Sequence, residues 1–470
     1  MTTKRWTLAV VCAATAMLML DIAVVNTALS RIAEDLDAGL SGLQWVVDAY
    51  TLALAGTVLT AGSLADRFGR RRLFTIGLAV FTAASAACAA APGIGELVAA
   101  RAVQGLGASI MFAVSLAILA HAFPEAKERA GALAAYGATI GASFAIGPLV
   151  GGALTSGLDW QWIFLVNVPI GLACLWVTRT YVVESRDPRA RRVDVPGQLT
   201  LAPGLLLLVL ALLRGNEDGW GSAPIVAAFA AAAVLLGGFL AIERHSAEPM
   251  LPLSFFRNQS FTGAQVAAFA ISASFFAVFL YTTLYLQQIL GMSAIEAGLV
   301  YLPGTVLMFF VSGATSAMGE RVSARAMIGA GLVLVAVGMV YMAAVAGTDS
   351  SWGAFLPGTL IACLGTGLFN PAVTAVALGS APVHQSGLAA GVNDTFRQAG
   401  IAVGVAALGA LVPAGAALGG GDPQAYVDGL RDALYAGAVL AAAGAVATAL
   451  LIRGRAHGEV MAGDLVPEAA

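Results

Sequence analysis

The sequence TLAVVCAATAMLMLDIAVVNTAL at residues 7–29 is an apolar run of membrane-spanning length that contains one carboxylate, Asp21. A helix needs about 20 apolar residues to cross the hydrocarbon core of a bilayer. A carboxylate at that depth costs about 2.5–3.5 kcal/mol on insertion scales, so Asp21 should face a cavity or a partner and serve a function. Lys4 and Arg5 precede the run, as basic residues do in a signal peptide, but the run is long and more spans follow. We therefore expect an uncleaved first helix.

The composition indicates an integral membrane protein. The chain has 470 residues, of which 59% are hydrophobic and 11% are charged, whereas a soluble domain carries roughly 25% charged residues. The apolar runs are continuous, which favours helices over a β-barrel. The four cysteines fall inside apolar runs and lack the spacing of a disulfide framework or a metal site. We find no nucleotide-binding motif and no nucleophile–base pair, so we expect neither an enzyme nor a metal, a cofactor or a nucleic-acid partner.

Fourteen apolar runs are candidate spans. They cover residues 7–29, 43–64, 73–92, 97–119, 131–154, 161–181, 197–214, 222–242, 260–287, 297–318, 324–346, 353–378, 387–411 and 430–452. With the N-terminus inside, the inner segments carry most of the lysines and arginines, and the outer segments carry only Arg31, Arg214 and Arg431. The positive-inside rule therefore predicts a multi-pass protein of the cytoplasmic (inner) cell membrane with both termini in the cytoplasm.

Charged stretches at 182–195 and 243–258 bracket two of these spans. We therefore predict an all-α membrane protein in which two six-helix bundles flank an inserted two-helix hairpin. The predicted units are 1–190 for the first bundle, 191–245 for the hairpin with its linkers, 246–456 for the second bundle and 457–470 for a cytoplasmic tail. The halves resemble each other weakly, since Gly105-Leu-Gly is echoed by Gly365-Thr-Gly. Repeated halves with a site between them are typical of alternating-access transporters.

The string GSLADRFGRR at residues 62–71 lies between the second and third spans, and it has a decayed counterpart, SAMGERVSAR, at 316–325. Its glycines permit a tight reversal. We expect Asp66 to meet the positive end of the helix that begins near Gly387, a contact that can form in one conformation and break in another. The predicted conformational latch comprises Gly62, Asp66, Arg67, Gly69, Arg70 and Arg71. The alternative is a basic anchor on the inner side with a turn.

This string resembles the signature loop of the major facilitator superfamily, and further motifs resemble its fourteen-span drug:proton antiporters. They are LDIAVVN at 20–26, RAVQGLG at 101–107, GPLVGG at 147–152, DWQWIFLVNVP at 159–169, PMLPL at 249–253 with FRN at 256–258, and TFRQAG at 395–400. Departures from the pattern are Ala23, Ser30, Ser143, Gln161, Ser323 and Asp394. The resemblance implies the major facilitator fold and export of lipophilic drugs or antibiotic-like compounds in exchange for protons.

The residues predicted to couple protons are Asp21, Arg101, Asp48 and Asp394. At 1.5 Å per residue, Asp21, Asp48 and Arg101 lie at similar depth in the outer half of the first bundle, so they could converge. Desolvation favours the neutral form of a carboxyl group and a nearby cation favours its ionised form. Structural alternatives remain: Asp21 could bond a neighbouring helix, Asp48 could reach interfacial water, and Arg101 could be a counter-ion. Asp394 and Arg397, three residues apart, could simply pair with each other.

The segment with Gly147, Pro148, Gly151 and Gly152 resembles the antiporter motif of the fifth helix, although tight packing alone would explain its glycines. Candidates for the substrate cavity are Asn26, Gln104, Asn167, Phe276, Tyr281, Asn370 and Arg397. We expect small lipophilic substrates, the proton as coupling ion, the lipid bilayer as surroundings, and a functional monomer. The alternatives are export of one endogenous metabolite, such as an amino acid, a siderophore or a biosynthetic product, and a non-transporting membrane sensor of the same fold.

Overall fold

The computed structural model describes residues 2–186, 193–318, 322–381, 385–413 and 421–453, and these residues form helices without a strand. The helices of the first half are α1 (Thr2–Asp35), α2 (Leu40–Phe68), α3 (Arg70–Ala89), α4 (Ile94–Ala122), α5 (Ala126–Gly157), α6 (Trp162–Leu165) and α7 (Asn167–Tyr181). The hairpin helices are α8 (Val195–Asp218) and α9 (Ala223–His245). The short 3₁₀ helix η1 (Leu253–Arg257) precedes the second half.

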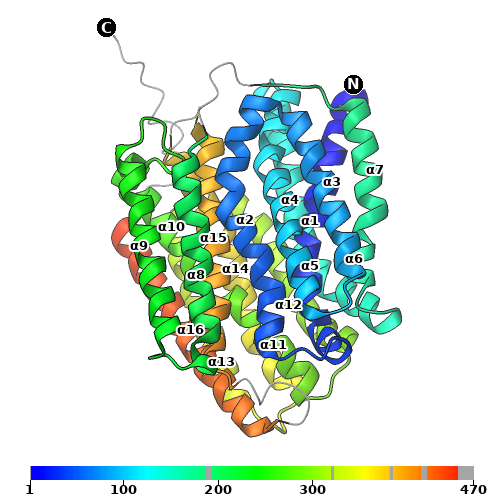
Figure 1. Ribbon diagram of the computed structural model, residues 1–470, viewed down its shortest axis with the longest axis vertical. Helices are drawn as coiled ribbons and strands as arrows, with labels where there is room; N and C mark the ends of the chain where they lie inside the picture. Colours follow the sequence, from blue (N-terminus) through cyan, green and yellow to red (C-terminus); the bar gives the residue numbers. More distant parts are fainter. Residues whose placement is uncertain (1, 187–192, 319–321, 382–384, 414–420, 454–470) are drawn as a thin grey trace.

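The second half begins with one long helix built from α10 (Gln259–Ile271), the π-helical η2 (Ser272–Phe276), α11 (Ala277–Leu284) and the π-helical η3 (Tyr285–Ile289). It continues with α12 (Ala294–Met318), α13 (Ala324–Val345), α14 (Trp352–Gly379), α15 (Ser386–Gly409) and α16 (Pro423–Leu451). The helices run along the long axis of the molecule, and α8 and α9 lie side by side at one edge (Figure 1). We call the end that holds Thr2 the N-terminal end, and the opposite end the remote end.

Within the described residues, thirteen helices are long and apolar enough to cross a membrane. The predicted span at 387–411 corresponds to α15, which has 24 residues but is too polar to join that set. Its polarity comes from Asn393, Asp394, Arg397 and Gln398, all in the middle of the helix. Such a helix is stable in a membrane when its polar side chains face the protein interior. The chain is therefore a multi-pass membrane protein.

Small residues set the packing within each half. A Cβ atom on Gly105 would overlap the backbone of α2 at Tyr50, and one on Gly107 would lie 2.6 Å from the Phe81 nitrogen of α3. In the second half, Gly365 approaches α13 at Gly331, and a Cβ on Gly367 would lie 2.9 Å from the Met308 oxygen of α12. These glycine pairs therefore let α4 and α14 each touch two neighbouring helices at backbone distance.

Candidate functional site

A buried carboxylate network joins helices of the first half. Asp21 on α1 and Arg101 on α4 form an ion pair, with side chains that are 0% and 2% exposed. The other Asp21 oxygen, Oδ1, accepts hydrogen bonds from the Gln104 amide at 2.8 Å and the Asn167 amide at 3.2 Å. Arg101 also donates from Nε to the Val46 carbonyl of α2 at 3.0 Å. Asp21 and Arg101 thus meet, as their predicted depth suggested.

Aromatic rings and a hydroxyl complete this environment. The Arg101 guanidinium lies 4.4 Å from the ring centre of Tyr50 and 5.7 Å from that of Phe164, distances at which a cation is attracted to a ring face. Gln104 donates a second bond to the Ser85 hydroxyl of α3 at 2.9 Å. Every charge in the network has a partner, which a buried ion pair requires to offset its desolvation. The side chains of Gln104 and Asn167, two predicted cavity residues, are therefore bound to Asp21 or its neighbours in this conformation.

Asp48 does not join the Asp21 network. The residue is 0% exposed, and neither of its carboxyl oxygens has a hydrogen-bond partner among the described residues. It lies on α2 one turn after Gln44, whose amide donates to the Tyr281 hydroxyl of α11 at 2.7 Å. Among the described residues Asp48 makes no ion pair with Arg101 and no hydrogen bond with Asp21, so its convergence with them stays a prediction. Residues at equal depth on three helices can still point in different directions. The face of α2 that carries Gln44 contacts the second half.

Tyr281 connects the two halves toward the remote end. Its hydroxyl accepts from Gln44 of the first half and donates to the Val405 carbonyl of α15. A second link runs from the Gln287 amide of η3 to the Thr27 carbonyl of α1 at 2.9 Å. These hydrogen bonds, together with the close packing of α5 on α12, hold the two halves against each other in this conformation.

The glycines of the predicted antiporter motif lie where α5 meets α1 and α12. Cβ atoms on Gly147 and Gly151 would overlap Ala23 and Thr27 of α1, and the glycine at 152 faces the backbone at Ala294 and 295 of α12. Across this contact the hydroxyl of Thr305 donates to the Ala145 carbonyl at 2.7 Å. The motif therefore forms part of the contact between the halves.

Pro148 lies inside α5, and its carbonyl oxygen is so close to Gly298 of α12 that a Cβ atom on this glycine would overlap it. The predicted cavity residue Asn26 bonds within its own helix, where its amide donates to the Ile22 carbonyl at 3.1 Å. It is half-buried on α1.

The signature loop adopts the strained reversal that its glycine suggested. Gly69 has φ +111°, a conformation that side-chain-bearing residues rarely adopt. Arg70 donates from Nε and Nη2 to one oxygen of Asp66 at 2.9 and 2.8 Å. Arg67 stacks 5.6 Å from the ring centre of Phe68, and Gly62 has open space around it. The proposed contact of Asp66 with the helix near Gly387 stays a prediction.

Glu184 was not predicted from the sequence, yet it organises this loop. Its carboxylate accepts from the backbone N–H groups of Arg71 at 3.0 Å and Arg72 at 3.1 Å, at the start of α3. The N–H of Arg70 donates to the Ser185 carbonyl at 2.9 Å. A carboxylate at a helix N-terminus satisfies free N–H groups and interacts favourably with the helix dipole. Its position in the linker after α7 gave no local signal. Residues 319–321 of the counterpart string lie outside the described residues.

A second polar cluster lies in the second half. Arg397 on α15 donates from Nη1 to the Asn370 oxygen of α14 at 3.2 Å and lies 5.9 Å from the ring centre of Phe276. Asn393 donates to Gln265 of α10 at 3.0 Å. Asp394 is 8% exposed, and its Oδ2 has no hydrogen-bond partner among the described residues. Asp394 and Arg397 do not form an ion pair within 4.0 Å, so the simple pairing suggested by their spacing is absent from this conformation.

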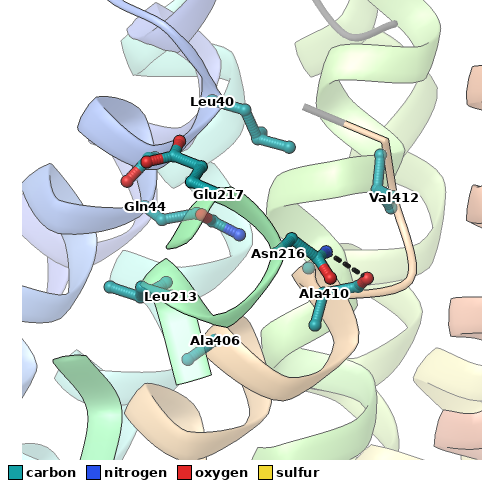
Figure 2. Close-up of a pocket in the computed structure, with 10 residues that line it drawn as sticks. Leu40, Gln44, Leu213, Asn216, Glu217, Ala406, Ala410 and Val412 are labelled. Carbon is teal, nitrogen blue, oxygen red and sulfur yellow. Dashed lines mark hydrogen bonds between the residues drawn. The ribbon is translucent and has the colours of Figure 1, made fainter. Parts of the chain in front are cut away.

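A small pocket at the remote end lies among α2, α8 and α15 (Figure 2). Its volume is about 20 Å³, which is room for one water molecule and too little for a drug-sized ligand. Asn216 of α8 closes one side by donating to the Ala410 carbonyl at 2.5 Å.

The described fold and motifs agree with comparisons to known proteins. The family description Major Facilitator Superfamily matches residues 11–405. The chain belongs to the Major Facilitator Superfamily. A member of this superfamily is a transporter of small molecules and not an enzyme.

Two relatives and one solved structure are similar to the chain. It is 37% identical to the multidrug resistance protein Stp of Mycobacterium tuberculosis, over 85% of this chain and 74% of that protein. It is 34% identical to a methylenomycin A resistance protein of Streptomyces coelicolor, over 84% of this chain and 83% of that protein. The crystal structure of peptide transporter POT has the same fold, with a TM-score of 0.68 at 16% identity over 95% of this chain and 96% of that one.

Proposed function

We propose that this transporter is a proton-coupled antiporter of the cytoplasmic membrane that exports lipophilic drugs or antibiotic-like compounds by alternating access. The names of the resistance proteins it is similar to support the export of such compounds. The observation that supports proton coupling is the Asp21 network, in which the buried carboxylate forms an ion pair with Arg101. In the described residues no other ion pair is as deeply buried.

In the proposed switch, the Asp21 carboxylate loses its ion pair with Arg101 when it takes up a proton. A proton on Asp21 removes its charge and leaves the Arg101 guanidinium without a counter-ion in an apolar environment, which is costly. It also weakens the hold of the carboxylate on Gln104 and Asn167, so both amides become free to turn toward a substrate. The energy source is the membrane potential, which supplies about 2.3 kcal/mol per proton at 100 mV.

Asp48 is the second proton-binding group in this proposal. An ionised carboxylate without any hydrogen bond would be very costly at this depth, so we take Asp48 to hold its proton while the halves are closed at the remote end. With both termini in the cytoplasm, the remote end is the outer face. Opening that face separates Gln44 from Tyr281 and brings water to Asp48.

The test is transport by purified protein in proteoliposomes across a panel of drugs and metabolites, with a pH-sensitive dye inside the vesicles. The wild type should show proton flux that depends on a compound. Asp21→Asn should abolish transport driven by an imposed pH gradient while membrane insertion stays normal. Asp349→Asn is the matched control, because Asp349 is exposed in the loop after α13.

Full gradient-driven transport by Asp21→Asn would remove this carboxylate from the coupling mechanism. A wild type without proton flux for any compound of the panel would contradict antiport itself. A response to a single metabolite and to no drug would favour the narrower exporter.

A further inference from the structure

Arg397 is a cation in the middle of the membrane domain that makes no ion-pair contact among the described residues, although Asp394 lies close enough for its charge to act on it. It lies near the centre of the 24-residue helix α15, and among the described residues no carboxylate comes within 4.0 Å of its guanidinium. A guanidinium has five N–H donors, and the hydrogen bond described for Arg397 is the one to Asn370. Arginines at this depth are normally paired or face a cavity or a pathway. Arg101, which is paired with Asp21, is the contrasting case in this chain.

The neighbouring carboxylate does not neutralise Arg397 by direct contact. Asp394 lies three residues earlier on the same helix, yet its Oδ2 has no hydrogen-bond partner among the described residues. The two charges act on each other at a distance, but the side chains form no ion pair within 4.0 Å. Donor groups on Arg397 remain available to another anion.

An amide and an aromatic ring of the second half lie next to Arg397, and a ring of the first half packs against that aromatic ring. Phe276 belongs to the π-helical η2, and π-helical turns are frequent at functional sites. Its ring centre lies 6.0 Å from that of Phe144 on α5 of the first half. Arg397, Asn370, Phe276 and Phe144 are all half-buried, so part of each side chain is accessible. Four helices thus bring one cation, one amide and two rings to the contact between the halves, where transporters of this architecture hold their substrates.

We infer that these four residues form a substrate subsite for the acidic group of an aromatic organic anion. Arg397 and Asn370 bind the carboxylate or phenolate, and Phe276 and Phe144 pack against the ring system. Hydrogen bonds between charged groups are the stronger class, so the acidic group selects the substrate, while the rings accept many shapes. This inference rests on the proposed export function and names the chemical class of substrate for it.

The test compares two dyes that share a xanthene ring, anionic fluorescein and cationic rhodamine 123. Binding to the purified full-length protein in lipid nanodiscs is measured by fluorescence polarisation without a proton gradient. Fluorescein should bind more tightly than rhodamine 123. Arg397→Gln should weaken fluorescein binding about tenfold or more, equivalent to about 1.4 kcal/mol, and leave rhodamine 123 within about twofold. Asp394→Asn should tighten fluorescein binding because it removes a competing negative charge.

Arg244→Gln is the matched control, since Arg244 is exposed at the end of α9. Arg397→Lys should restore part of the lost affinity, which a purely structural role for the guanidinium would not require. Equal weakening of both dyes by Arg397→Gln, a preference for rhodamine 123, or no fluorescein binding by the wild type would each overturn the subsite. If the protein binds the dyes but shows no proton flux in proteoliposomes, the result would contradict antiport and still support the subsite.

Discussion

Removing the Tyr281 hydroxyl should shift the protein toward a conformation that is open at the remote end. Tyr281→Phe deletes the group that accepts from Gln44 across the two halves at 2.7 Å. The net contribution of one such neutral hydrogen bond is about 0.5–1.5 kcal/mol. The bond between α2 and α11 is lost when the halves separate, so its removal should raise the open population about two- to tenfold. The Val405 carbonyl, in contrast, stays within the second half in both conformations.

Spin labels on either side of the closed end measure this population. Cysteines replace Glu34 on α1 and Asp349 after α13, two exposed residues, in a variant whose four native cysteines are substituted. Pulsed electron paramagnetic resonance then measures the distance between the two spin labels and gives the fraction of molecules with the longer, open distance. Tyr285→Phe is the matched control, because the Tyr285 hydroxyl bonds to the Gly347 carbonyl at 2.7 Å within the second half. An equal rise in both variants, or none in Tyr281→Phe, would refute the assignment of Tyr281 as a link between the halves.

Three further changes test other features of the structure. Gly69→Ala should lower the melting temperature in detergent, since a side chain at φ +111° costs about 1–3 kcal/mol; an unchanged melting temperature would show that the loop relaxes. Asp66→Asn, which weakens the pair with Arg70, should slow transport roughly two- to fivefold at equal expression, as expected for a partly exposed ion pair; unchanged turnover would reduce the loop to a topological anchor. Gly298→Ala should raise the open fraction in the spin-label assay, because the new Cβ atom would overlap the Pro148 carbonyl, and a population equal to wild type would contradict that packing.

The fold could be predicted because membrane helices follow from local composition. Each apolar run corresponds to a helix, or to consecutive helical segments, whose bounds differ from the prediction by several residues at most. The apolar run at 387–411 predicts α15, although four central polar residues leave this helix outside the set that is apolar enough to cross a membrane by composition. Its polarity is explained by contacts with other helices.

The site was only partly predictable. The depth of each residue along its helix correctly predicted the contact of Asp21 with Arg101, because opposite charges at equal depth in a membrane protein tend to pair. Depth could not show that Gln44 contacts the second half, since the rotation of α2 depends on packing against several helices. The contacts of Gln44 with Tyr281 and of Glu184 with α3 join residues more than 100 positions apart. No local pattern in a single sequence encodes such pairs.

The attachment of α8 to both halves has a mechanical consequence. Gln198 of this helix donates to the Gly56 carbonyl at 2.7 Å and accepts from Thr60 at 2.5 Å, so two hydrogen bonds join it to α2. At its other end the exposed Asn216 holds α15 through the single bond to Ala410. Because α8 makes two of these three hydrogen bonds with α2, we expect the hairpin to move with the first half when the halves separate. We then expect the Asn216–Ala410 hydrogen bond to break whenever the halves separate at the remote end, so the hairpin should slow each turnover slightly.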